Sequence, residues 1–119
     1  MYKQQFDYAE SYYFLVRCGN HHKTAKLRIT SLLNLGTKLA IKSRKSPEIV
    51  GNVLKSIFCR LEDKNCLVRL QDLGYSIYTK QRKLKSFNSL ISEIRKVGPH
   101  PKLVRLLGIR NWDIIMFLF

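Results

Sequence analysis

Residues 46–62, with the sequence SPEIVGNVLKSIFCRLE, decide the fold class of this chain. Their apolar side chains recur at i, i+1, i+4, i+5, i+8, i+9 and i+12, and they are Ile49, Val50, Val53, Leu54, Ile57, Phe58 and Leu61. This period is typical of an α-helix with one broad apolar face. Ser46 can cap the free amides at the start, Pro47 suits the first turn, and Glu48 complements the positive end of the helix dipole. The stretch therefore predicts a helix that buries one face.

Two later segments repeat this pattern. Residues 66–80 place on one helical face the apolar side chains of Cys66, Leu67, Leu70, Leu73, Ile77 and Tyr78. Gly74 lies on the same face, where we expect it to allow another helix to approach closely. Residues 86–97, which Ser86 can cap, do the same with Phe87, Leu90, Ile91, Ile94 and Val97. Gly98 and Pro99 then end this helix.

The flanking segments are predicted to form shorter helices. Residues 2–17 fit a helix with Tyr2, Phe6, Ala9, Tyr13 and Val16 on one face, although the apolar run 12–16 also fits a buried strand. Residues 23–35 form the next helix, which Gly36 ends, and residues 37–42 add a further short turn. Residues 102–107 form a short helix stopped by Gly108, and Asn111 can cap a terminal helix over 112–119.

These elements predict an all-α fold, a compact antiparallel array of five to seven short helices in a single domain over residues 1–119. No segment shows the turn chemistry of a β-hairpin. The predicted core residues come from the three central helices and are Ile49, Val53, Leu54, Ile57, Phe58, Leu61, Leu70, Leu73, Ile77, Phe87, Leu90, Ile91 and Ile94.

Residues 46–85 also resemble a known group of helical folds. Arg60 and Leu61 end one helix, a short turn over residues 63–65 follows, and the segment 67–70, LVRL, opens the next helix. This arrangement resembles VHS and ENTH domains, and HEAT repeats more generally. The resemblance implies an antiparallel α-helical array. As an alternative function, it implies an adaptor module that binds other proteins or an anionic membrane surface.

The residue types that perform catalysis or bind metals form no recognisable constellation. Cys18, Cys59 and Cys66 lack the paired short spacing of a zinc site. His21 and His22 lie in a polar turn, the eight carboxylates form no acid–base pair, and the six glycines form no phosphate-binding loop. We therefore expect no enzymatic activity, no metal and no cofactor. The thiols are expected to act as small apolar groups in a reducing compartment.

The hydropathy of the chain gives two further expectations. No apolar run approaches the ~20 residues that span a bilayer, and the first residues, MYKQQFDY, lack the apolar segment of a secretory signal. We therefore expect an intracellular protein without a transmembrane segment. The apolar C-terminus, with Ile114, Ile115, Phe117 and Phe119, is expected to dock on the protein's own core or on a partner protein.

Charge is the strongest functional signal in the sequence. The net charge is +14 in 119 residues, and residues 21–50 hold seven Lys and Arg against one acidic residue, while residues 81–119 hold eight against two. Such an excess opposes compaction by self-repulsion unless a polyanion relieves it. We therefore expect binding to nucleic acid, RNA rather than DNA, as a structural component of a ribonucleoprotein such as the ribosome. A merely solvated basic surface remains the alternative.

Two basic connections between predicted helices are the candidate contact sites, because loops expose cations to a phosphate backbone. The candidate nucleic-acid-binding residues are Lys42, Arg44 and Lys45 in the first connection and Lys80, Arg82, Lys83 and Lys85 in the second. Each connection follows an even-numbered helix of an antiparallel array, so both are expected to emerge at the same end and to form one patch. The tyrosines and Trp112 could stack on bases, but their helical spacing favours packing in the core.

Overall fold

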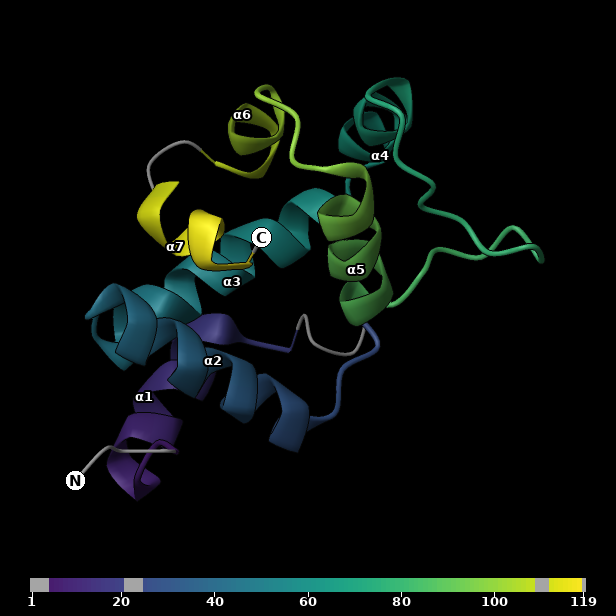
Figure 1. Ribbon diagram of the computed structural model, residues 1–119. Coiled ribbons are helices and arrows are strands. Elements are labelled where there is room, and N and C mark those ends of the chain that lie inside the picture. The colour runs from purple at the N-terminus through teal and green to yellow at the C-terminus, as the bar shows by residue number, and fades with distance from the viewer. Residues whose placement is uncertain (1–4, 21–24, 109–111, 119) are drawn as a thin grey trace.

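The computed structural model describes residues 5–20, 25–108 and 112–118, and this part of the chain contains seven α-helices and no β-strand (Figure 1). The helices are α1 (Tyr8–Cys18), α2 (Ile29–Ser43), α3 (Pro47–Glu62), α4 (Lys64–Asp72), α5 (Phe87–Val97), α6 (Leu103–Leu107) and α7 (Trp112–Leu118). The predicted all-α class is confirmed. In Figure 1, α2 and α3 run in opposite directions, whereas α4 and α6 cross α3 steeply.

Helix α3 is the centre of the fold, and its predicted start is confirmed. The Ser46 hydroxyl accepts a hydrogen bond from the Ile49 amide at 3.3 Å, with Pro47 in the first turn. Val50, Val53, Leu54, Ile57 and Phe58 are buried, and the Phe58 ring meets that of Phe87 on α5 edge-on, with centroids 5.0 Å apart.

The predicted core is largely confirmed, with one error. Ile49 is 45% exposed. At the first turn of α3 the buried face of the helix includes the neighbouring Val50, and Ile49 lies outside it. Leu61, Leu73 and Ile91 are half-buried and pack against the core from its edge.

Helix α1 settles the choice between helix and strand for residues 12–16. It begins with a capping box, in which the Glu10 amide donates to the Asp7 carboxylate at 2.8 Å and the Asp7 amide donates to the Glu10 carboxylate at 3.1 Å. The predicted apolar face was wrong in part. Phe6 is buried as expected, but Tyr13 and Val16 are more than half exposed while Phe14 and Cys18 are completely buried, and Tyr2 lies outside the described residues.

Two glycines allow α1 to pack closely against α2 and α3. A Cβ at Gly36 on α2 would lie 2.5 Å from Cζ of Phe14, and a Cβ at Gly51 on α3 would lie 2.7 Å from the Phe14 carbonyl oxygen. Only a residue without a side chain fits at either place. The prediction that Gly36 ends a helix was therefore wrong: α2 continues through it to Ser43, and the glycine admits the ring of Phe14.

The prediction for Gly74 was also wrong. The helix predicted over 66–80 ends at Asp72, and Gly74 follows with φ +97°, a conformation that glycine adopts without strain. No heavy atom lies within 4 Å of a Cβ built there, so no other helix approaches closely. The chain continues without helix to Ser86, with Tyr75 and Ile77 buried.

The C-terminal helix docks on the protein's own core. Ile114, Ile115 and Leu118 are buried against the rest of the core, while Phe117 is 40% exposed. Arg95 of α5 holds this end by donating from Nε and Nη2 to the Leu118 carbonyl oxygen at 3.0 and 2.7 Å. Phe119 and the predicted cap Asn111 lie outside the described residues. Within the described part of the chain, none of the helices has the length and apolar character needed to cross a membrane.

Candidate nucleic-acid interface

Between α4 and α5 the chain folds back on itself in what we call the basic hairpin, residues 78–85. Tyr78 and Leu84 form an isolated antiparallel β-bridge, and the Thr79 amide donates to the Lys83 carbonyl oxygen at 2.7 Å. At the tip, the Arg82 amide donates to the Thr79 carbonyl oxygen at 2.9 Å, and Arg82 has φ +63°. The sequence predicted no hairpin, because the turn over residues 79–82 lacks the usual Asn-Gly pair and has Arg82, not a glycine, in the left-handed conformation.

The basic hairpin projects from the helical body (Figure 1). Lys80, Arg82 and Lys83 are exposed, and the chain contains no acidic residue between Asp72 and Glu93. Among the described residues, no carboxylate pairs with these three cations. Lys85 is half-buried at the base, where its ammonium group donates to the Ser76 hydroxyl at 3.3 Å.

A further cation lies at the base of the basic hairpin. The Lys26 ammonium group donates to the Leu84 carbonyl oxygen at 2.8 Å, and the Phe87 amide donates to the Ala25 carbonyl oxygen at 2.9 Å. These bonds fasten the segment before α2 to the hairpin and to the start of α5. The sequence marked Lys26 as basic but did not join it to this site, because 58 residues separate Lys26 from Leu84.

The first connection is short and tied to the helices around it. Arg44 ends α2 in the left-handed conformation, and the Lys45 amide donates to the Ser43 hydroxyl at 3.3 Å. The Lys45 ammonium group lies 3.5 Å from the Asp113 carboxylate of α7. Lys42, Arg44 and Lys45 are nevertheless exposed, so Lys42 and Arg44 can still meet an anion.

The structure does not bring the two connections together. Figure 1 places the α2–α3 connection on one side of the molecule and the basic hairpin on the other, so they do not form the single patch that was expected. The expectation treated residues 66–80 as one helix that crosses the whole array. Because α4 ends at Asp72, the chain leaves the array early and the hairpin extends sideways.

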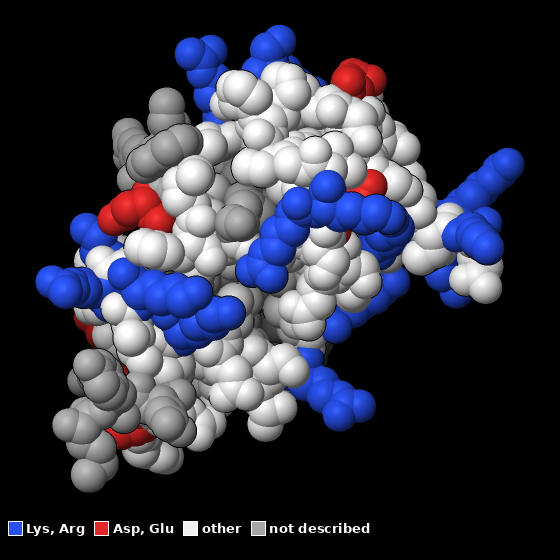
Figure 2. Space-filling model, viewed as in Figure 1, with Lys and Arg blue, Asp and Glu red and all other residues white. Residues whose placement is uncertain are grey.

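Cationic side chains also stand across the face between these two sites. In Figure 2, Lys and Arg atoms extend from the left edge, across the middle of the view, to the hairpin at the right, and acidic atoms are few. Lys23 and Arg110, which belong to the basic stretches 21–50 and 81–119, lie outside the described residues. The positively charged surface is therefore broad, and the basic hairpin is the part that projects most clearly.

The tyrosines differ from the expectation that they pack in the core. Tyr75 is buried, whereas Tyr8, Tyr12 and Tyr13 are exposed along α1, and Tyr78 at the start of the basic hairpin is 39% exposed. An exposed ring next to unpaired cations can stack on an unpaired base. The sequence pattern assigned Tyr78 to a helix face, so its exposed position at the start of the basic hairpin was missed.

Two of the three cysteines have thiols that their surroundings hold in the protonated form. None of the three forms a disulfide, and burial raises the pKa of the Cys18 thiol from 9.0 to about 11. Burial and the nearby Asp63 carboxylate also raise the pKa of the Cys66 thiol. Thiols held in the protonated form are weak nucleophiles and weak metal ligands. Among the described residues, no group of three His, Cys, Asp or Glu side chains could hold a metal ion, and His21 and His22 lie outside them.

Comparison with known proteins found no family model that matches the chain and no solved structure that is significantly similar to it. The resemblance of residues 46–85 to VHS, ENTH and HEAT-type folds therefore stays a prediction.

Proposed function

We propose that this protein binds nucleic acid, RNA in preference to DNA, through contacts between phosphates and the basic hairpin. One observation carries the proposal: Lys80, Arg82 and Lys83 are exposed on a projecting hairpin whose surroundings in the described chain offer them no carboxylate. Cations arranged in this way release the counterions of a polyanion when they bind it, which is the main source of affinity for a nucleic-acid backbone.

The preference for RNA rests on the shape and composition of the hairpin. Tyr78 can stack on an unpaired base while the neighbouring cations hold the backbone, a combination that suits single-stranded loops of RNA. The contacts position the molecule and carry little sequence information.

The first basic connection suggests a structural role in a ribonucleoprotein. The end of α2 and the α2–α3 connection, which carry Lys42 and Arg44, lie on the side of the molecule away from the basic hairpin, so one molecule can touch two separate phosphate backbones (Figure 1). A small basic protein with two such contacts can hold neighbouring RNA segments together.

The test is the salt dependence of RNA binding, measured by fluorescence anisotropy with a labelled RNA stem-loop between about 50 and about 200 mM salt. Affinity should fall steeply, and a flat response would reject the proposal. The double variant Arg82→Glu/Lys83→Glu should weaken binding roughly tenfold or more and reduce the salt slope by ~0.7–0.9 for each phosphate that the protein no longer neutralises. The matched control is Lys55→Glu/Lys64→Glu, which makes the same change of charge at exposed positions outside the hairpin.

Acidic lipid is the competing polyanion. Vesicles with and without anionic lipid should be compared with the RNA under the same conditions. If the protein binds the anionic vesicles tightly and the RNA weakly, the surface serves a membrane and the proposal fails.

A further inference from the structure

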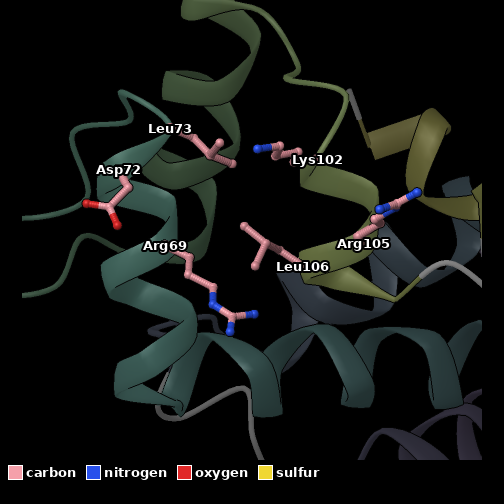
Figure 3. A pocket seen from close by; sticks show the side chains of 6 residues that line it. All are labelled: Arg69, Asp72, Leu73, Lys102, Arg105 and Leu106. Carbon is pink, nitrogen blue, oxygen red and sulfur yellow. The ribbon is translucent and has the colours of Figure 1, made fainter.

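An open cavity of about 380 Å³ lies between α4 and α6, away from the basic hairpin (Figure 3). Its lining residues are Arg69, Asp72, Leu73, Lys102, Arg105 and Leu106. We call it the α4–α6 cavity. The proposed nucleic-acid function does not use it.

The floor of the α4–α6 cavity is apolar. Leu73 and Leu106 point toward each other across it, and both are half-buried against the core (Figure 3). The Leu106 carbonyl oxygen accepts from Nη1 of Arg60 at 3.2 Å and from the Cys66 thiol at 3.9 Å, so α6 is fastened to α3 and α4 beneath the cavity.

A chain of hydrogen bonds holds the segment that carries Lys102. The Tyr75 hydroxyl donates to the Gly98 carbonyl oxygen at 2.8 Å and accepts from the His100 amide at 2.7 Å. The Lys102 amide in turn donates to Nδ1 of His100 at 3.0 Å. Because Tyr75 is buried, these hydrogen bonds anchor the segment between α5 and α6 to the core. The Lys102 side of the cavity is therefore held in place.

The charge that faces the cavity is positive. Figure 3 shows the Lys102 side chain reaching over the cavity toward Leu73 and the Arg69 guanidinium group on the opposite side, below Leu106. The Asp72 carboxylate and the Arg105 guanidinium group point outward. Among the described residues, no carboxylate forms an ion pair with Arg69, Lys102 or Arg105.

We propose that the α4–α6 cavity binds an acidic segment of a partner protein, inserting an apolar side chain between Leu73 and Leu106 and placing carboxylates on Lys102 and Arg69. An amphipathic helix with acidic residues beside a leucine offers both groups at helical spacing. A nucleobase fits less well, because the lining contains no aromatic ring for stacking and no amide or hydroxyl side chain for the base edges. A partner protein for this cavity is independent of RNA binding at the hairpin.

The probe is a fluorescein-labelled helical peptide with leucines on one face and glutamates on both sides of that face, titrated by anisotropy at near-physiological salt. We expect saturable binding. A second peptide in which serine replaces every leucine has the same charge and should lose binding, since the apolar floor then has no partner. If both peptides bind alike, the attraction is diffuse electrostatics and the proposal is overturned.

The protein variants separate this site from the rest of the basic surface. Arg69→Glu/Lys102→Glu should weaken peptide binding by about tenfold or more, as the removal of charge pairs from an interface does. The control Lys55→Glu/Lys64→Glu should change it little, and an equal loss in both would reject the cavity as the site. Lys102→Glu alone repeats the test with a single change at the residue before α6, and circular dichroism checks the fold of each variant.

RNA serves as the competitor in the same assay. An RNA stem-loop should bind the cavity variant as well as it binds the wild type, whereas Arg82→Glu/Lys83→Glu should bind the peptide normally. If the cavity variant loses RNA and the wild type never binds the peptide, nucleic acid is the occupant and the proposal is wrong. Failure of RNA binding at the hairpin alone would leave the peptide result unaffected.

Discussion

Helices α1, α2 and α3 form one packed unit, and the basic hairpin lies apart from it. Glycine is needed in these two regions for different reasons. In the three-helix unit, Gly36 and Gly51 are needed because a Cβ would collide with Phe14. At the entrance to the hairpin, Gly74 has open space around it and is needed for its φ of +97°. The glycines of the three-helix unit are therefore fixed by close packing, whereas Gly74 is fixed by its backbone conformation, and the exposed side chains of the hairpin beyond it are not packed against the core.

The largest expected effect is the loss of a core side chain in the unit. Leu54 is completely buried on α3, so Leu54→Ala removes buried apolar atoms and leaves a cavity. We expect the free energy of unfolding to fall by ~2–5 kcal/mol, measured by urea denaturation. Exposed Asn52→Ala on the same helix is the control, and a loss below about 1 kcal/mol at Leu54 would contradict the central place of α3.

The second effect is a pH dependence from Cys18 at the end of α1. Burial raises the pKa of its thiol from 9.0 to about 11, so the unfolded chain loses this proton first as the pH rises. The stabilisation is therefore complete below pH 9.0 and is lost progressively as the pH approaches about 11. The whole effect amounts to a few kcal/mol at most, since each tenfold difference in proton affinity between the folded and unfolded chain is worth about 1.4 kcal/mol. Cys18→Ala should flatten this part of the curve, and an unchanged curve would show that other groups cause it.

The third effect tests the close packing of α1 against α3. Gly51→Ala places a methyl group against the backbone of Phe14, which cannot rotate away as a side chain could. We expect ~1–3 kcal/mol of destabilisation, the usual range for overpacking, measured by thermal or urea unfolding. A stabilised variant, which the gain in helix propensity alone would produce, would show that α1 does not lie as described.

The fourth effect is smaller and has a different cause. Gly74→Ala meets no neighbouring atom but forces a side chain into a left-handed conformation. We expect about 1–2 kcal/mol of destabilisation, measured by urea denaturation. Gly74→Asn should recover part of it, because asparagine tolerates positive φ better than alanine. Equal losses for alanine and asparagine would mean that space rather than conformation decides this position.

The smallest expected effect on stability comes from the hairpin cations themselves. Arg82→Glu/Lys83→Glu alters exposed side chains without a described ion pair, so the free energy of unfolding should change by no more than about 0.5 kcal/mol. The same variant should lose RNA affinity, as proposed above. A large drop in the unfolding midpoint would instead show that these residues stabilise the fold, as the packed residues of the three-helix unit do.

Sequence reasoning was most reliable where local chemistry and periodicity agreed. Ser46 and Ser86 each accept a hydrogen bond from the amide three residues later, and the helices that follow end within a residue of their predicted ends. The candidate site was predicted in part. The cations of both connections are exposed as expected, apart from the half-buried Lys85, but their separation, the contribution of Lys26 and the exposure of Tyr78 were not foreseen.

The sequence by itself determined the helical class, the broad apolar face of α3, and the excess of positive charge, because helix periodicity, capping and net charge are local or additive properties of the chain. The tertiary structure alone decided that Gly36 continues a helix while Gly74 follows the end of one, since only the neighbouring Phe14 distinguishes them. It also decided that one basic connection is tied down beside Asp113 while the other projects as the basic hairpin. Both connections have similar compositions, and the difference arises from where α4 ends and from which distant residues lie beside each one.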